Sequence, residues 1–319
     1  MQHSKFAVKN KAYCLWGHNL RDSNLEFIGG IDSNYFRYVA EVHSANLAGE
    51  KRQSAALAIR LNYFHSLESF FSLLMAALQG PDSVAGWLHQ YQTKRLHELV
   101  IAIGKGAEFK TKFDFPNGFS WLEISKLVHH SVLETEMFNE KNIQSFASIW
   151  SKFAKEFTDT QINNEYNSIK HGFRVCPGGM KVSLRVEGKQ ETNPIIIGDS
   201  IYGSSFFVPE GLIKDTTTHF RLRKHSVNWD PHSLVKRAEV LADSMNNVIS
   251  FLKMVNGVPP ENTFYSIPDD AEKLEDCWGK ESGLIKFSVN AKITKDDITH
   301  ISDDEIIASY NVKNKRSES

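Results

Sequence analysis

Apolar side chains recur with a helical period over most of the first 260 residues. Across residues 51–79, the side chains within about 80° of Leu67 on a helical wheel form a wide apolar stripe, which predicts a long core-facing helix. Gly80 and Pro81 end that helix, and a second one is predicted over 84–103. Together they predict a long helical hairpin with a tight turn.

Further helices are predicted from periodicity and from end signals. Ser120 and Glu123 have the spacing of a capping box, Asp159 or Thr160 caps a later helix, and Pro231 stands at a first helical position. The predicted ranges are 120–133, 142–157, 159–171 and 230–255.

The period changes from helical to alternating after residue 180. Val182, Leu184 and Val186 alternate with polar residues, which is typical of a half-buried strand. Further strands are predicted at 204–208, 218–227 and 284–289. The fold class is therefore α+β and mostly α, a helical bundle with a long helical hairpin and a small antiparallel β insertion.

Three segments follow from this pattern. Residues 1–48 are an N-terminal loop-rich segment, with a short strand or helix expected around 35–42. Residues 49–257 are the helical bundle with its β insertion at about 180–228. Residues 258–319 carry 8 basic and 13 acidic side chains, which makes them an acidic C-terminal segment of mixed structure.

Composition narrows the classes of function. The 319 residues hold 37 Lys and Arg against 38 Asp and Glu, so any attraction to nucleic acid must come from a local patch. No apolar run approaches the roughly 18 residues of a membrane span, and no signal-type stretch follows the N-terminus. Three widely spaced cysteines favour a reducing compartment, and we expect a cytoplasmic protein.

Two polar positions are assigned structural roles. Arg60 lies on the apolar side of its helix, where it either reaches back to solvent or pairs with a buried carboxylate. The pair His129 and His130, with Glu134 one turn later, lacks further ligands at a convincing spacing and is assigned a surface or capping role. We expect no metal and no cofactor.

The helix predicted over 159–171 carries the most informative residues. Asn167 and His171 are four residues apart, so their side chains are neighbours on its outward face. Gly172 has the character of a left-handed residue that ends the helix. Lys170 and His171 then lie in the last turn, where the helix dipole favours protonated side chains, which makes His171 a candidate proton donor.

Two interpretations of this helix end remain open. Lys-His-Gly is a good helix C-terminus on grounds of stability alone. However, Asn163, Asn164 and Asn167 together cost about 1 to 2 kcal/mol of helix stability relative to alanine. A cost without a local benefit points to a functional site.

A local basic patch lies nearby in the sequence. Residues 170–225 hold nine Lys and Arg against five acidic residues. If its densest part is a strand, Arg221 and Arg223 share a face with His219 and His225, a ladder that could contact phosphates. The alternative is a solvated edge strand whose charges discourage aggregation.

The order of elements resembles a known family. A long helical hairpin followed by a shorter helix that ends in Tyr166-Asn167-Ser168-Ile169-Lys170-His171 resembles the HEPN superfamily over about residues 50–256. The usual motif of that superfamily is an arginine, four to six residues and a histidine, often with asparagine directly after the arginine. Asn167 and His171 occupy the asparagine and histidine positions, and Tyr166 stands in place of the arginine.

The resemblance implies an RNA-directed protein. Active members cut RNA without metal at a cleft between two copies. The resemblance would make His171 the acid or base and Asn167 the residue that orients His171 or the phosphate. Lys170 or Arg174 would supply the positive charge, and Arg221 and Arg223 would be further phosphate-binding residues. The expected function is therefore a homodimeric, metal-independent endoribonuclease of toxin or defence type.

A second hypothesis comes from another class of function. The chain could be a non-catalytic helical module that binds a protein or a small ligand through the face of Asn167 and His171. Tyr166 at the arginine position favours this hypothesis.

Overall fold

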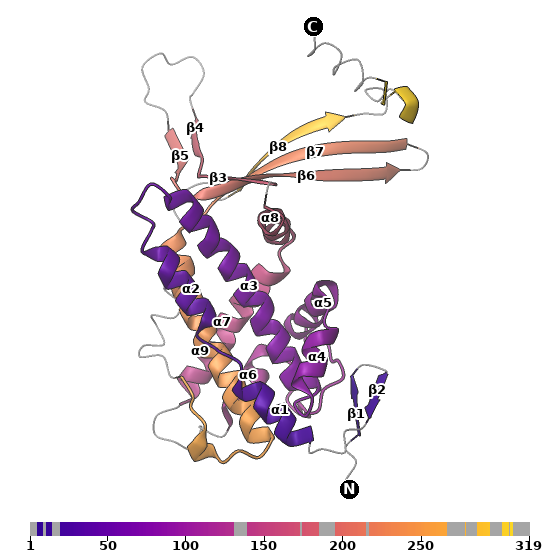
Figure 1. Cartoon of the computed structure of the whole chain (residues 1–319), viewed down its shortest axis with the longest axis vertical. Coiled ribbons are helices and arrows are strands. Elements are labelled where there is room, and N and C mark those ends of the chain that lie inside the picture. Colours follow the sequence, from indigo (N-terminus) through magenta and orange to yellow (C-terminus); the bar gives the residue numbers. More distant parts are fainter. Residues whose placement is uncertain are drawn as a thin grey trace.

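The computed structural model shows a mostly helical α+β protein, which confirms the predicted fold class (Figure 1). The residues that the structure describes are 5–8, 11–14, 20–130, 139–172, 174–184, 195–214, 217–266, 278, 286–293, 302–305 and 307–308.

The helices have the following bounds: α1 Leu20–Gly29, α2 Tyr35–Ser44, α3 Arg52–Gln79, α4 Val84–Gln90, α5 Thr93–Gly104, α6 Trp121–His129, α7 Glu140–Thr158, α8 Thr160–Lys170 and α9 Pro231–Val255. The strands are β1 Lys5–Val8, β2 Lys11–Cys14, β3 Val175–Pro177, β4 Lys181–Leu184, β5 Ile195–Asp199, β6 Gly203–Lys214, β7 Thr217–Asn228 and β8 Lys286–Ile293. A short 3₁₀ turn follows α9 at Pro260–Asn262.

Helix α3 is the centre of the bundle. It packs along α9 and also contacts α2, α5, α7 and α8. Phe70, Phe71, Leu74 and Met75 have no exposed surface, as expected for a helix that is apolar on most of its circumference. Among the described residues, no helix combines the length and the apolar character needed to cross a membrane.

The second arm of the predicted hairpin is broken. Instead of one helix over 84–103, the chain forms α4 and α5, with extended backbone at Tyr91 between them. The Tyr91 hydroxyl donates to Oε1 of Gln79 at 2.8 Å, and the Thr93 hydroxyl donates to Oε1 of Glu68 at 3.0 Å. Both bonds hold the break against α3, so the partners that favour it lie outside the local sequence.

The predicted helix ends are found where local chemistry placed them. The Ser120 hydroxyl accepts from the Glu123 amide at 3.3 Å, and Oδ1 of Asp159 accepts from the amides of Gln161 and Ile162 at 2.8 and 3.0 Å. Pro231 is the first residue of α9. The helix predicted over 120–133 ends at His129, and residues 131–138 lie outside the described ranges.

An antiparallel sheet of order β3-β6-β7-β8 lies across one end of the bundle, with α8 beneath it (Figure 1). The predicted strands at 204–208, 218–227 and 284–289 lie within β6, β7 and partly β8, and the one starting at Val182 lies in β4. Strand β7 pairs with both β6 and β8, so within the described sheet it is not the edge strand that one interpretation expected.

Two described parts of the C-terminal segment pack on the rest of the chain. Strand β8 pairs with β7, and the Trp278 indole donates to Glu156 on α7. Thus residues from 258–319 contribute both to the sheet and to the surface of the bundle.

Candidate functional site

The C-terminal end of α8 presents the predicted polar residues to solvent. The side chains of Asn167, Lys170 and His171 are exposed. The His171 amide donates to the Asn167 carbonyl at 3.3 Å, and Gly172 has a φ of 73°, so the helix ends in the predicted left-handed turn. Asn167 and His171 are therefore accessible neighbours at the end of one helix.

Tyr166, at the arginine position of the motif, faces inward. Its side chain is buried, and its hydroxyl donates to Oε2 of Glu68 on α3 at 2.9 Å. Burial, together with the Glu68 carboxylate, raises the pKa of the Tyr166 hydroxyl far above its ordinary value, so it remains a proton donor to Glu68. Tyr166 anchors α8 to α3 and does not supply the positive charge that an exposed arginine would supply.

A second histidine lies against the same helix. The His65 ring on α3 meets the Tyr166 ring edge-on, with 5.4 Å between the centroids. Burial and the positive charge of Lys170 lower the pKa of His65, while Glu68 opposes the shift. His65 is thus neutral at pH 7 and able to accept a proton. Spacing along α3 does not show that α8 packs there, so the sequence alone does not place His65 at this helix end.

One of the other two asparagines of α8, Asn163, has a structural role. The Asn163 amide donates to the carbonyls of Phe157 and Asp159 at 3.0 and 2.9 Å, which ties α8 to the end of α7. Both Asn163 and Asn164 are half-buried. The presence of Asn163 therefore needs no functional explanation, and Asn167 is the exposed asparagine of the three.

The basic residues after α8 lie on neighbouring segments. Arg174 is exposed and directly precedes β3, where Val175 pairs with Phe206, and Phe206 pairs in turn with His225. Two residues from His225 on β7, Arg223 is half-buried and opposes Val208. Arg174 therefore lies directly before β3 and Arg223 on β7, with β6 between these two strands.

Arg221 and His225 are two more positions of the predicted ladder. Arg221 pairs by its backbone with Glu210 on β6 and Lys292 on β8, and its side chain is outside what the structure describes. His225 is buried and stacks on Phe206 at 5.4 Å between centroids. His225 is thus part of the core and is not available to contact a phosphate at the surface.

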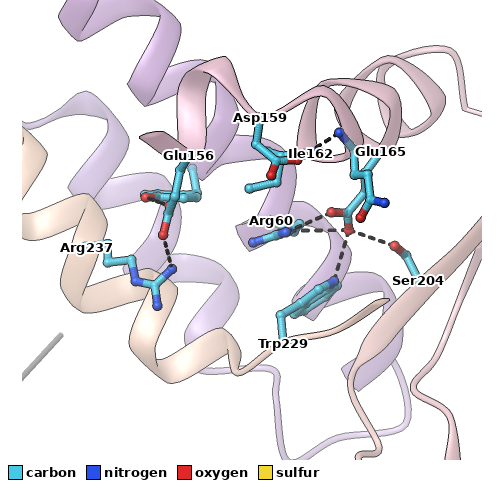
Figure 2. Close-up of polar contacts among 10 residues, drawn as sticks. Arg60, Glu156, Asp159, Ile162, Glu165, Ser204, Trp229 and Arg237 are labelled. Carbon is cyan, nitrogen blue, oxygen red and sulfur yellow. Dashed lines mark hydrogen bonds and ion pairs between the residues drawn. The ribbon is translucent and has the colours of Figure 1, made fainter. Parts of the chain in front are cut away.

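A buried carboxylate holds the middle of α8 in place (Figure 2). Glu165 has no exposed surface, and its Oε2 accepts from Nη2 of Arg60 at 2.7 Å. Its Oε1 accepts from Nε of Arg60 at 3.3 Å, from Ser204 at 2.7 Å and from the Trp229 indole at 3.0 Å. This confirms the interpretation of Arg60 as the partner of a buried carboxylate.

A second ion pair lies on the other side of Arg60. Nη1 of Arg237 on α9 donates to Oε1 of Glu156 at 3.0 Å, and the Trp278 indole donates to the same oxygen at 2.8 Å. The Tyr63 hydroxyl donates to the other oxygen of Glu156. Burial and Glu156 raise the pKa of Tyr63 well above its ordinary value, so this hydroxyl also stays protonated. This ion pair was not predicted from the sequence.

Comparison with protein-family models, with curated proteins and with solved structures returned no match. The functional conclusion therefore depends on the side chains described above.

Proposed function

We propose that this protein is an HEPN-like, RNA-directed protein that binds the RNA backbone at the C-terminal end of α8. The observation that supports the proposal is the joint exposure of Asn167, Lys170, His171 and Arg174, in the last turn of α8 and directly after it. Lysine and arginine at such a surface neutralise phosphates, and this charge is local in a chain whose net charge is −1.

The proposed chemistry is metal-independent cleavage. The 2′-hydroxyl oxygen attacks the adjacent phosphorus, and the bond from phosphorus to the 5′ oxygen breaks. His171 assists transfer of the 2′-hydroxyl proton or donates a proton to the leaving oxygen. Asn167 orients His171 or the phosphate, and Lys170 or Arg174 stabilises the phosphate charge.

The proposed active form is a cytoplasmic homodimer. In the family that the chain resembles, the motif residues of two copies meet in a cleft, so the second copy would complete the site. Sedimentation of the purified protein measures this directly, and a monomer at micromolar concentration would contradict the dimeric site.

Replacing His171 by alanine is expected to abolish RNA cleavage. Loss of a general acid or base typically costs about 10² to 10⁴ in rate. The measurement is cleavage of an end-labelled single-stranded RNA in EDTA, which removes divalent metal. His89→Ala is the matched control, since His89 is exposed on α4 away from α8 and that variant should cleave like the wild type.

Two results would contradict the enzymatic proposal. Cleavage by His171→Ala at the wild-type rate would remove His171 from the reaction. No cleavage by wild-type protein at micromolar concentration would exclude the nuclease and leave binding alone.

A non-catalytic binding module is the second candidate function, and one observation favours it. The arginine position holds Tyr166, whose hydroxyl is committed to Glu68. RNA binding then separates the candidates: Arg174→Ala should weaken binding and reduce the salt dependence by about one phosphate contact. If wild-type protein binds no RNA at low salt, the surface at the end of α8 serves a protein or a small ligand instead.

A further inference from the structure

A cavity of about 300 Å³ lies beside the Arg60–Glu165 and Arg237–Glu156 ion pairs, at the start of α8 and thus at the end opposite His171. Residues from α3, α7, α8, α9 and the end of β7 line it. Its volume is at the lower end of the roughly 300 to 1,000 Å³ of typical ligand pockets. The cavity is therefore large enough for a small molecule.

The acidic side chains of this cavity already have partners. Glu165 accepts from Arg60, Ser204 and Trp229. Glu156 accepts from Arg237, Trp278 and Tyr63, as described above. Asp159 caps α8. A ligand thus meets acceptors that are already engaged.

Cationic donors remain available to a ligand. Arg60 uses Nε and Nη2 on Glu165, and in Figure 2 the end of its guanidinium remote from Glu165 points toward Glu156 and Arg237. Arg60 is only 5% exposed and lies at the floor of the cavity. Lys155 is exposed at its mouth, and within the described ranges no residue accepts from its ammonium group.

The position of Arg60 is also held by aromatic rings. Its guanidinium carbon lies 4.5 Å from the centroid of the Phe64 ring and 5.6 Å from that of Trp229. A guanidinium that is already oriented loses little freedom when it binds a planar carboxylate. The floor of the cavity is thus prepared for an anionic group.

We propose that this cavity binds a small dicarboxylate. One carboxylate accepts from Nη1 of Arg60 at the floor, and the other pairs with Lys155 at the mouth. Ile162 and Val227, which also line the cavity, contact the methylene groups between them. The two carboxylates of this ligand thus meet the available donors, Arg60 and Lys155. Its methylene groups need no hydrogen bond from the acidic side chains, which already have partners.

Succinate and glutarate are the probes for this proposal, with inorganic phosphate and neutral succinamide as comparisons. We expect saturable heat on titration of the full-length protein with a dicarboxylate, and a shift of the Trp229 indole N–H resonance, assigned with Trp229→Phe. Lys155→Glu should weaken binding roughly tenfold or more, because it replaces an ion pair by a like charge. Lys94→Glu, on the exposed face of α5, should stay within about twofold of wild type.

The proposal fails if neither dicarboxylate moves the Trp229 resonance, if succinamide or phosphate binds as tightly, or if Lys155→Glu binds like the wild type. The titration needs no RNA, and His171→Ala should bind succinate as well as the wild type does. Failure of the RNA proposal and failure of this one are therefore separate results.

Discussion

Replacing Glu165 by glutamine is expected to lower the free energy of unfolding by about 3 to 5 kcal/mol, because the Arg60 guanidinium would then be buried without a counter-charge. The side chains of this pair are only 7% and 1% exposed, for Arg60 and Glu165 respectively. Since small proteins are stable by about 5 to 15 kcal/mol, the loss would be a large part of the total. Urea unfolding followed by tryptophan fluorescence measures it.

A double variant separates loss of the charge pair from general damage. In Arg60→Met with Glu165→Gln, the uncompensated charge is gone, and the glutamine oxygen still accepts from Ser204 and Trp229. The double variant should therefore lose less than the sum of the two single changes, with a coupling of about 1 to 3 kcal/mol.

The matched control is a surface pair. Arg95 and Glu98 are 49% and 50% exposed, so Glu98→Gln should change stability by less than about 1 kcal/mol. If Glu165→Gln loses no more stability than Glu98→Gln, the Arg60–Glu165 pair does not hold α8 in place. The same follows if the losses of the two single variants add up to the loss of the double variant. If Glu165→Gln does not fold, recovery in the double variant supports the same conclusion.

Acid is expected to destabilise the protein through His129. The ring has no exposed surface and stacks on Phe146 and Trp150, with centroids 4.8 and 5.7 Å away. This corrects the surface or capping role assigned from sequence, which holds for the exposed His130 but not for His129. Burial lowers the pKa of His129 to about 4, and the backbone hydrogen bond to Ser125 opposes part of the shift.

The hydrogen bonds of His129 specify its neutral form. Nδ1 lies 2.8 Å from the Ser125 carbonyl, which can only accept, so Nδ1 carries the hydrogen. Nδ2 of Asn247 lies 3.1 Å from Nε2, and Oδ1 of the same amide accepts from the Ser266 backbone N–H at 2.7 Å. The amide therefore cannot turn round, and a proton on Nε2 would face a donor.

The sign of the pH effect follows from the two pKa values. In the folded state the pKa of His129 is about 4, below the value of about 6.5 in the unfolded chain. At a pH between these two values the unfolded chain therefore binds one more proton than the folded protein. Stability from this group is present above pH 6.5 and is lost as the pH falls to about 4. The loss amounts to about 3 kcal/mol, after which both states are protonated and no more is lost.

Two measurements check this prediction. Urea unfolding between pH 4 and 7 gives the free energy of unfolding at each pH. Its slope against pH should be smaller in His129→Gln than in the wild type, and unchanged in His130→Gln, a variant of the adjacent exposed histidine. An NMR titration of the wild-type imidazole should give a pKa near 4 for His129, and a value above 6 would contradict the neutral buried ring.

Local chemistry made the ends of α8 predictable. Asp159 caps the helix by accepting from an amide two residues later, and Gly172 reverses the chain directly after His171. Both features depend only on residues that are close in sequence. The exposure of Asn167 and His171 follows from the helical period. A period does not show a break such as that at Tyr91, because the apolar pattern continues across it.

The sequence by itself determined the positions of α3, α7, α8 and α9, how α8 begins and ends, and which of its residues reach solvent. Only the tertiary structure decided that Tyr166 is held by Glu68, that Arg60 meets Glu165 from 105 positions away, and that His129 is sealed between rings. The physical reason is that propensity, period and capping act over a few residues. By contrast, the partner of a buried polar group depends on which distant elements pack against it.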